Sequence, residues 1–389
     1  MNRIAEDVKP GIDDMQTRLI EIVARVIGKS DREHPADAVL REELKRAAGL
    51  SRADGREISR AVFAFYRWRG WLNQPEPVVD RIIKAIELNE RFKERSNTFT
   101  DEELVAKTVP DWVNEQMEVL PVWARSLQTE PQIWLRARHG RAKILAEELG
   151  KCWVGDGILD DAICYEGSED LFRTAEFHHG EFQLQDISSQ AVGLLCKPQP
   201  GETWWDACAG EGGKLLHLSD LMQNKGLIWA SDRIEWRLKK LKQRAARAKV
   251  FNYRVALWNG GEKLPTKTKF DGVLVDSPCT GLGTWQRNPH ARWTITPDDV
   301  RDLMDVQKRL LENAVPAVKP GGKLIYSVCT MTVAETNEVV AAFGKQFPQL
   351  KPLALTNPFN PKETADQLWF WPHEVGGNGM FVAAWKKIE

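Results

Sequence analysis

The sequence predicts an α/β protein in which a doubly wound parallel-sheet domain follows a helical domain and a small α+β subdomain. Helical spacing of apolar residues dominates the chain from about residue 12 to 127. A strand-like alternation follows, and from residue 187 short apolar strands alternate with helices, which is the rhythm of a sheet covered on both faces. We therefore expect three parts, with the boundaries 1–128, 129–186 and 187–389.

The first part is predicted to be helical because apolar side chains recur three and four residues apart. They do so over residues 58–66 and again over residues 78–86. Residues 63–71 also mix aromatic and cationic side chains, which could stack on RNA, although their helical spacing favours a place in the core. Residues 1–128 are therefore a possible RNA-binding domain.

The second part shows shorter patterns. Pro121 and Pro131 bracket a change in the chain. Residues 133–138 alternate like a strand, and residues 141–149 have helical spacing. A small α+β subdomain fits these patterns.

The third part carries the alternating strands and helices of a parallel sheet. Strands are expected at 203–207, 226–231, 252–257, 270–275, 322–328 and 380–385, and helices at 188–196, 214–224, 233–249, 297–317 and 334–345.

Composition excludes several classes of protein. The start of the chain is acidic without a signal-peptide hydrophobic region, and no apolar run approaches the roughly 20 residues that span a bilayer. The six cysteines are scattered singly, without a CxxC pair. We expect a cytoplasmic, monomeric protein with reduced thiols, no metal and no membrane partner.

Charge points to no particular partner for the whole chain, because the net charge is -1. The exception is local: nine basic residues and one acid, Glu235, lie between Arg233 and Arg254. Apolar side chains recur at helical spacing within this stretch, so the bases project from the other faces of a helix. A solvated helix face and an RNA groove both remain open as interpretations.

A glycine-rich turn is the best candidate for a cofactor site. The pattern of residues 203–215 predicts a strand, a turn of small residues and the start of a helix. In such a turn the glycines let a ligand approach the backbone, and the free N–H groups of the helix start can bind it. A Walker A loop is disfavoured because Leu215 follows Gly-Gly-Lys, and GxGxxG is absent. Asp232 ends the next strand, which suits ribose hydroxyls. S-adenosylmethionine fits best, and an ordinary tight turn is the alternative.

Two cysteines, Cys279 and Cys329, each follow an apolar strand. A thiol at the carboxyl end of a strand can be exposed and activated for nucleophilic attack, and two thiols in one cleft could divide one chemical task. A lone cysteine in such a place is more often a small core residue.

Three sequence blocks, in order, resemble the signatures of the RNA cytosine-C5 methyltransferases of the Fmu/Sun type. They are 206–214 (DACAGEGGK), 276–284 (DSPCTGLGT) with 287–289 (RNP), and 326–330 (YSVCT) with 335–338 (ETNE); residues 185–190 (QDISSQ) resemble the segment that precedes the cofactor turn. The helical region is similar in layout to the RNA-binding domain of bacterial small-subunit rRNA methylases. The resemblance implies a Rossmann-like methyltransferase domain that uses S-adenosylmethionine and acts on RNA, with rRNA favoured over tRNA.

The resemblance also implies three catalytic roles. Cys329 matches the nucleophile that adds to carbon 6 of cytosine and makes carbon 5 reactive. Asp276 would hold the ring amino group or N3, and Cys279 would assist release of the methylated base. A cytosine would have to be unpaired or flipped out of its helix to reach the thiol.

The resemblance further implies a set of cofactor contacts: Cys208, Ala209, Gly210, Glu211, Gly212, Gly213, Lys214, Asp232, Asn259 and Asp276. Two of them depart from the usual pattern, since Glu211 replaces a proline and Asn259 an aspartate. Asn259 can still hydrogen-bond an adenine edge. Glu211 favours the helix dipole but could repel the carboxylate of the cofactor.

On the RNA side, the resemblance places residues 287–289 beside the target base, with Trp285 available to support stacking; a purely structural loop is equally open. A different class of function is an RNA-binding or ribosome-assembly factor that keeps the fold without turnover. Retention of Asp276, Cys279 and Cys329 together argues against that class.

Overall fold

The computed structural model describes residues 14–388, so the acidic start of the chain lies outside the described residues. The chain divides into two compact units. One contains the residues up to 130 together with 285–296, and the other contains residues 131–284 and those from 297 onward. Within the described part, no helix has the length and apolar character needed to cross a bilayer.

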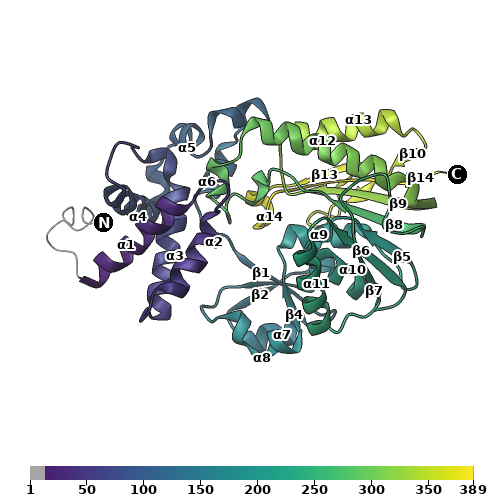
Figure 1. The fold of residues 1–389 in the computed structure, drawn as a ribbon, viewed down its shortest axis with the longest axis horizontal. Helices are drawn as coiled ribbons and strands as arrows, with labels where there is room; N and C mark the ends of the chain where they lie inside the picture. Colours follow the sequence, from purple (N-terminus) through teal and green to yellow (C-terminus); the bar gives the residue numbers. More distant parts are fainter. Residues whose placement is uncertain (1–13, 389) are drawn as a thin grey trace. The chain divides into compact units, whose positions relative to one another are not determined.

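The first unit is helical, as predicted. Its α-helices are α1 (Asp14–Lys29), α2 (Ala36–Arg46), α3 (Arg52–Arg67), α4 (Val78–Arg95), α5 (Asp101–Lys107) and α6 (Pro121–Ser126) (Figure 1). Helix α3 begins with a capping box, in which the Ser51 hydroxyl accepts the Asp54 N–H and the Asp54 carboxylate accepts the Ser51 N–H. Helices α1, α3 and α4 contact one another around the apolar stripes that the sequence shows.

The aromatic cluster of the helical unit is a core, which confirms the favoured interpretation. Trp68 is fully buried, and its ring lies 5.5 Å from that of Phe92 and 5.0 Å from that of Phe99. Arg67 is buried too, with its guanidinium donating to the Asn89 carboxamide oxygen at 3.2 Å. These side chains are therefore not available to stack on RNA.

In the sequence, residues 285–296 lie between two segments of the second unit. In the structure, they pack as part of the first unit. Trp285 is fully buried, with its ring edge-on to that of Trp112 at 6.2 Å. The prediction that Trp285 supports base stacking is therefore wrong, because the helical unit covers the ring. Arg292 is also fully buried, and its guanidinium donates to four backbone carbonyls, those of Arg67, Thr108, Leu127 and Trp285.

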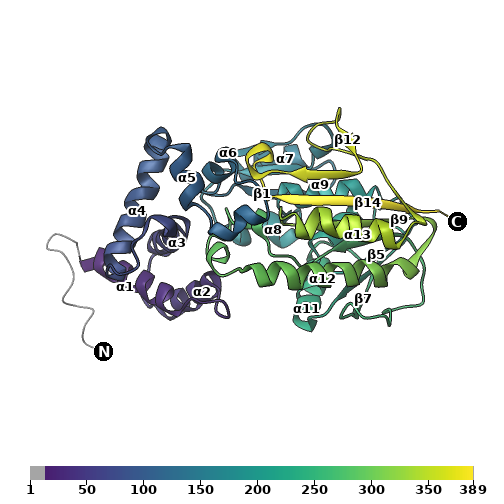
Figure 2. The ribbon, with the colours of Figure 1, turned by 90° about the horizontal axis from the view of Figure 1, so that it is seen from above.

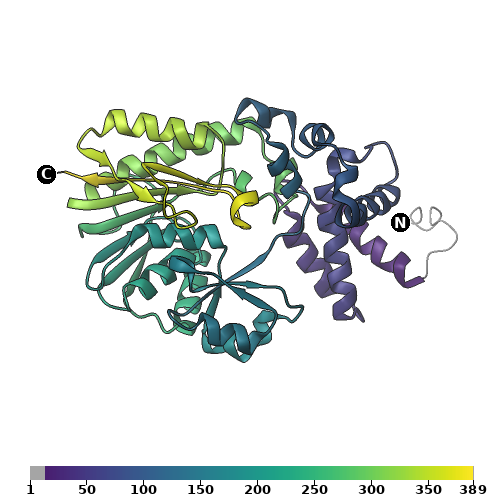
Figure 3. The same ribbon diagram turned by 180° about the vertical axis from the view of Figure 1, so that it is seen from behind.

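The second unit begins with a small antiparallel sheet of order β2-β3-β1-β4, drawn in blue to teal in Figure 3. Its elements are β1 (Ile133–Ala137), α7 (Ala142–Leu149), β2 (Cys152–Val154), β3 (Ala162–Tyr165), α8 (Ala175–His179) and β4 (Phe182–Leu184). Leu135, Ile163 and Phe182 form its core with the apolar face of α7. This is the α+β region that the sequence indicates.

The large sheet has the order β10-β14-β9-β8-β5-β6-β7, with β13 also paired to β14. Its strands are β5 (Thr203–Asp206), β6 (Leu227–Asp232), β7 (Tyr253–Leu257), β8 (Phe270–Asp276), β9 (Val318–Val328), β10 (Leu350–Pro352), β13 (Gln367–Phe370) and β14 (Met380–Lys387). Strands β5 to β9 are parallel, and β14 runs antiparallel to β9. The doubly wound α/β fold is therefore confirmed.

Helices cover both faces of this sheet (Figures 1 and 2). They are α9 (Ile187–Cys196), α10 (Gly213–Leu221) and α11 (Glu235–Arg247) on one face, and α12 (Pro297–Ala314) and α13 (Val339–Gln346) on the other. The neighbouring residues Trp204 and Trp205 point to opposite faces, since the first joins the core under α9 to α11 and the second the core under α12 and α13.

The structure differs from the predicted ranges in several places. Strand β9 begins four residues before the predicted range, and the helix expected at 334–345 begins with a π-helical turn, Ala334–Glu338, before α13. The short strands β10, β11 (Leu355–Thr356), β12 (Thr364–Ala365) and β13 and the helix α14 (Pro372–Val375) have no counterpart among the predicted elements. Two to four residues are too few to show a period.

Arg292 should be a large contributor to the stability of the helical unit. Arg292→Met removes a buried donor of four hydrogen bonds, and we expect the free energy of unfolding to fall by about 3 kcal/mol or more. Arg287→Met, in the same segment but exposed, should change it by less than about 0.5 kcal/mol. Urea unfolding of both variants measures the difference, and equal losses would contradict the assignment.

Candidate active site

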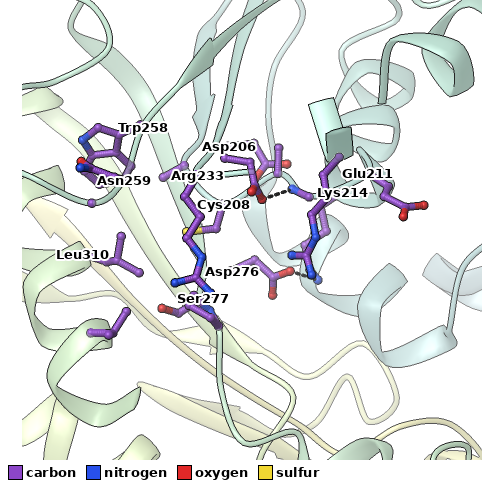
Figure 4. A pocket seen from close by; sticks show the side chains of 18 of the residues that line it. Asp206, Cys208, Glu211, Lys214, Arg233, Trp258, Asn259, Asp276, Ser277 and Leu310 are labelled. Atoms are coloured by element: carbon purple, nitrogen blue, oxygen red, sulfur yellow. Dashed lines mark hydrogen bonds and ion pairs between the residues drawn. The ribbon is translucent and has the colours of Figure 1, made fainter. Parts of the chain in front are cut away.

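A cavity of about 460 Å³ opens at the carboxyl ends of the central strands (Figure 4). It lies where the order of strands reverses between β5 and β8, which is the usual ligand site of an open α/β sheet. Its lining includes the predicted turn from Cys208 to Lys214 apart from Gly212, together with Asp206, Asp232, Trp258, Asn259, Asp276 and Leu310. The structure thus brings the predicted cofactor contacts together.

The turn after β5 needs its glycines. Gly210 and Gly212 have φ of +54° and +87°, in the region that side chains disfavour. A Cβ on Gly212 would also lie 2.7 Å from the Leu241 side chain. The Gly210 N–H donates to Asp232 Oδ2 at 3.0 Å, and the Ile234 N–H donates to Oδ1 of the same carboxylate at 2.8 Å. Asp232 therefore fixes the turn as well as facing the cavity.

An ion pair connects the cofactor turn to β8. Lys214 Nζ lies 2.7 Å from Asp276 Oδ2, and the Ser327 hydroxyl donates to Asp276 Oδ1 at 2.7 Å. Burial alone would lower the pKa of Lys214, but the charge and hydrogen bond of Asp276 outweigh it and the pKa is raised. The ammonium stays charged, and it holds the Asp276 carboxylate in one orientation.

A second acid of the cavity, Asp206, is buried without such a partner. It is 1% exposed, and neither carboxylate oxygen has a hydrogen bond of ordinary geometry. Burial raises its pKa to about 8, helped by the negative charge of Asp276. Asp206 is thus a neutral acid below that pH, and a cation that entered the cavity would favour its ionised form.

The two predicted thiols meet. Cys279 Sγ lies 3.3 Å from Cys329 Sγ, because each cysteine follows one of two paired strands, β8 and β9. The contact with Cys329 raises the pKa of the Cys279 thiol well above its ordinary value, and burial adds to the effect. Cys279 therefore keeps its proton at neutral pH, which suits a proton-transfer group better than a nucleophile.

Cys208 also lines the cavity, but its sulfur is no rival nucleophile. Burial raises the pKa of its thiol well above the ordinary value, and the charges of Asp206, Asp276 and Asp232 act in the same direction. A protonated, buried thiol is a poor nucleophile.

The two departures from the family pattern have mild consequences. Glu211 forms an ion pair with Lys240 of α11, with 3.2 Å between Oε1 and Nζ, so its carboxylate turns from the cavity toward that helix (Figure 4). The carboxamide oxygen of Asn259 accepts the Gly261 N–H at 3.1 Å, which orients the side chain at the rim. The predicted repulsion between Glu211 and a cofactor carboxylate is therefore weakened by a neighbouring cation.

The basic residues between Arg233 and Arg254 differ in their contacts. Arg244 and Arg247 donate to the Gln183 carboxamide oxygen of β4, and the Arg247 guanidinium lies 3.8 Å from the centre of the Phe177 ring. These two arginines therefore attach α11 to the small sheet. Other bases of the helix, such as Lys239 and Lys242, are exposed, which agrees with a solvated face and leaves an RNA groove untested.

Several residues of the site were missed by reasoning from the sequence. Ser327 and the pairing with Lys214 hold the Asp276 carboxylate, and Arg233 and Arg309 line the cavity. Alternation along β9 could have suggested Ser327, which lies two residues before Cys329. Across the described part of the chain, no group of three or more metal-ligating side chains gathers.

The order of the large sheet, with its antiparallel β14, and a cavity over a glycine turn define the Rossmann-like methyltransferase class. Residues 193–386 match the family model described as 16S rRNA methyltransferase RsmB/F. The chain belongs to this family of RNA cytosine-C5 methyltransferases.

Individual relatives agree with the family. The chain is 37% identical, over 77% of its length and 72% of the other protein, to a probable ribosomal RNA small subunit methyltransferase B of Synechocystis. It is 37% identical, over 54% of its length and 41% of the other, to the mouse tRNA (cytosine(72)-C(5))-methyltransferase NSUN6. The crystal structure of a methyltransferase homologue from Pyrococcus horikoshii is 28% identical and superimposes with a TM-score of 0.57, covering 69% of this chain and 90% of the other.

Asp206 should make the stability of the protein fall as pH rises. In the unfolded chain this acid ionises above about pH 4, whereas in the fold it keeps its proton to about pH 8. The folded state therefore binds more protons across that window, and stability decreases there by up to about 1.4 kcal/mol per pH unit.

Asp206→Asn removes this titration while keeping the shape of the side chain. The difference in unfolding free energy between Asp206→Asn and the natural protein should grow from about pH 4 to about pH 8 and then level off. Urea unfolding at several pH values measures it. A difference independent of pH would show that Asp206 is already ionised in the fold.

Proposed function

We propose that this protein transfers a methyl group from S-adenosylmethionine to carbon 5 of a cytosine in RNA, with rRNA as the favoured target. The observation that carries the proposal is the contact of 3.3 Å between the sulfurs of Cys279 and Cys329. The carboxylate of Asp276, at the end of β8, is held in place by Lys214. Membership of the RNA cytosine-C5 methyltransferase family supports it. Two thiols and an acid suit a reaction that needs attack, base orientation and release.

The cavity suits the cofactor in size and charge. A volume of about 460 Å³ lies in the range of cofactor sites. Asp232 would receive the ribose hydroxyls, and Trp258, Asn259 and Leu310 would surround the adenine. The buried Asp206 carboxyl, which lacks a hydrogen-bond partner, favours a ligand that carries positive charge. S-adenosylmethionine is such a ligand, and it supplies a methyl group bonded to a positively charged sulfur.

The residues of the chain would prepare the base and release it. The Cys329 sulfur would form a bond to carbon 6 of the cytosine, which places electron density on carbon 5. Asp276, kept in place by Lys214 and Ser327, would hold the amino group or N3 of the ring as that density develops. Carbon 5 would then lose its proton to water, and the electron pair of that bond would re-form the double bond between carbons 5 and 6. The bond between carbon 6 and sulfur would break at the same time and return the Cys329 thiolate.

Cys279 is placed to assist that last step. Its sulfur lies against the Cys329 sulfur, and its raised pKa leaves it with a proton at neutral pH. A donor beside the leaving sulfur stabilises the thiolate as it departs. Cys279 would therefore speed release rather than attack.

The choice of RNA rests on the relatives, one of which is named a probable small-subunit rRNA methyltransferase and another a tRNA methyltransferase. The rRNA relative shares more of the chain, 77% against 54%, which favours rRNA. Bisulfite sequencing of RNA from cells that lack the protein tests this choice: loss of an rRNA site supports rRNA, and loss of a tRNA site supports tRNA.

Methyl transfer should depend on the two thiols in different ways. Incubation with labelled cofactor and total RNA should place label in 5-methylcytosine, and Cys329→Ala should lower the rate about a thousandfold or more by removing the attacking sulfur. Cys279→Ala should accumulate a covalent complex with RNA, visible as a shifted band in denaturing gels. Cys152→Ala, in β2 of the small sheet, is the matched control.

Lack of transfer by the natural protein to any RNA would favour the non-catalytic RNA-binding factor. Full activity of both active-site variants would show that the roles of the cysteines are wrong. Accumulation of the covalent complex by Cys329→Ala instead of Cys279→Ala would exchange the two roles.

Cofactor affinity should be insensitive to the unusual acid of the turn. Because Lys240 neutralises Glu211, Glu211→Gln should change the dissociation constant of S-adenosylmethionine by less than about threefold. Asp232→Asn should weaken binding by about tenfold or more, through the turn and the ribose contact. Isothermal titration calorimetry measures the dissociation constant of each variant. A large gain in affinity for Glu211→Gln would mean that the carboxylate does repel the ligand.

A further inference from the structure

One buried carboxylate, that of Glu335, holds both of the loops that carry the active-site thiols. Its Oε1 accepts the Thr280 N–H at 2.9 Å, and its Oε2 accepts the hydroxyls of Thr280 and, at 3.3 Å, of Thr330. The two hydroxyl oxygens are themselves 3.0 Å apart. Thr280 immediately follows Cys279, and Thr330 immediately follows Cys329. The carboxylate therefore joins the residue after one thiol to the residue after the other.

Further neutral donors complete the surroundings of this carboxylate. The Gln307 NH2 group donates to Glu335 Oε1 at 3.0 Å and also to the Pro278 carbonyl at 3.0 Å, on the residue before Cys279. The Thr332 hydroxyl donates to Oε2 at 2.8 Å. Glu335, Gln307 and Thr332 are all fully buried. A buried acid held by neutral donors is costly compared with apolar packing, so its presence points to a functional constraint.

The backbone beneath Glu335 is also unusual. Residues Ala334–Glu338 form a π-helical turn, in which the Glu338 N–H donates to the Val333 carbonyl at 3.1 Å. Such wide turns are frequent at functional sites. Here the turn starts the helix that continues as α13. The Tyr326 hydroxyl donates to the Glu335 carbonyl at 2.7 Å, which ties the turn to β9.

We propose that Glu335 is a positioning residue for both thiols, acting by fixing the residue that follows each cysteine. It sets the distance and direction at which the two sulfurs meet, without touching the substrate. Its charge has a second effect, since it adds to the Cys329 contact and to burial in raising the pKa of the Cys279 thiol. This inference rests on the proposed function, in which both sulfurs act on one base.

A kinetic comparison tests the positioning role. Glu335→Gln keeps the size of the side chain but turns one acceptor oxygen into an NH2 group, which faces the donors described above. We expect its single-turnover rates of RNA adduct formation and of methyl transfer to fall about tenfold or more. The KM for the cofactor should stay within about twofold, because other residues line that cavity. Glu338→Gln, an exposed residue of the same turn, should behave as the natural protein.

A chemical measurement tests the contact without any methyl transfer. The charged or titratable groups that face Cys279 are Cys329, Glu335 and, through its hydroxyl, Tyr326, whose own pKa burial raises well above its ordinary value. In a Cys329→Ala background, Glu335→Gln should therefore speed alkylation of Cys279 by iodoacetamide about threefold or more at about pH 8.5. Mass spectrometry of the Cys279 peptide reports the rate, and Glu338→Gln should leave it unchanged.

The outcomes separate the two levels of inference. If the natural protein transfers no methyl group, the proposed function is wrong. The alkylation rates would still show whether Glu335 acts on the loop that carries Cys279. Unchanged rates of alkylation and methyl transfer in a folded Glu335→Gln would overturn the positioning role. If Glu335→Gln does not fold, Thr280→Val is the alternative variant, because it removes one hydroxyl donor alone. A fall in the rate of methyl transfer of about threefold or more, with an unchanged KM for the cofactor, supports the proposal. A rate equal to that of the natural protein overturns it.

Discussion

The ion pair between Lys214 and Asp276 is the interaction on which the rest of the site depends. Lys214 lies in the first turn of α10, and Asp276 ends β8, so the pair bridges the point where the order of strands reverses. The buried Lys214 ammonium would be costly without this partner, whereas the Asp276 carboxylate is partly exposed. Because the other carboxylate oxygen accepts the Ser327 hydroxyl, one bonded chain runs from the cofactor turn through β8 to β9, which Cys329 follows.

The cavity carries both acidic and basic side chains. Asp206, Asp232 and Asp276 line it, and each is in a different state: Asp276 is paired with a lysine, Asp232 accepts backbone N–H groups, and Asp206 keeps a proton. Lys214, Arg233 and Arg309 line the same cavity, so its charge is mixed. A ligand with a positive centre near Asp206 would favour the ionised form of this buried acid. The electrostatics of the cavity are therefore compatible with the class of cofactor that the turn suggests.

The sequence was informative where a pattern is local and repeated. Strand and helix periodicity located β5 to β9 within one to four residues, and the glycine turn with its two cysteines located the site. Contacts between residues far apart in the sequence could not be read in this way, such as Ser327 beside Asp276 or Glu335 beside Thr280. Trp285 shows the opposite error, because nothing local reveals that residues 285–296 leave one unit and pack in the other.

The two thiols show how an arrangement symmetrical in sequence becomes asymmetrical in space. Both follow strands, yet Cys329 comes directly after β9, whose Ser327 donates to the Asp276 carboxylate, while Cys279 lies beyond Pro278 in a loop. The contact with Cys329, burial and the charge of Glu335 all raise the pKa of the Cys279 thiol, so this thiol keeps its proton at neutral pH. In the proposed reaction Cys329 attacks and Cys279 assists release, and the proton that Cys279 keeps then lies 3.3 Å from the sulfur that has to leave.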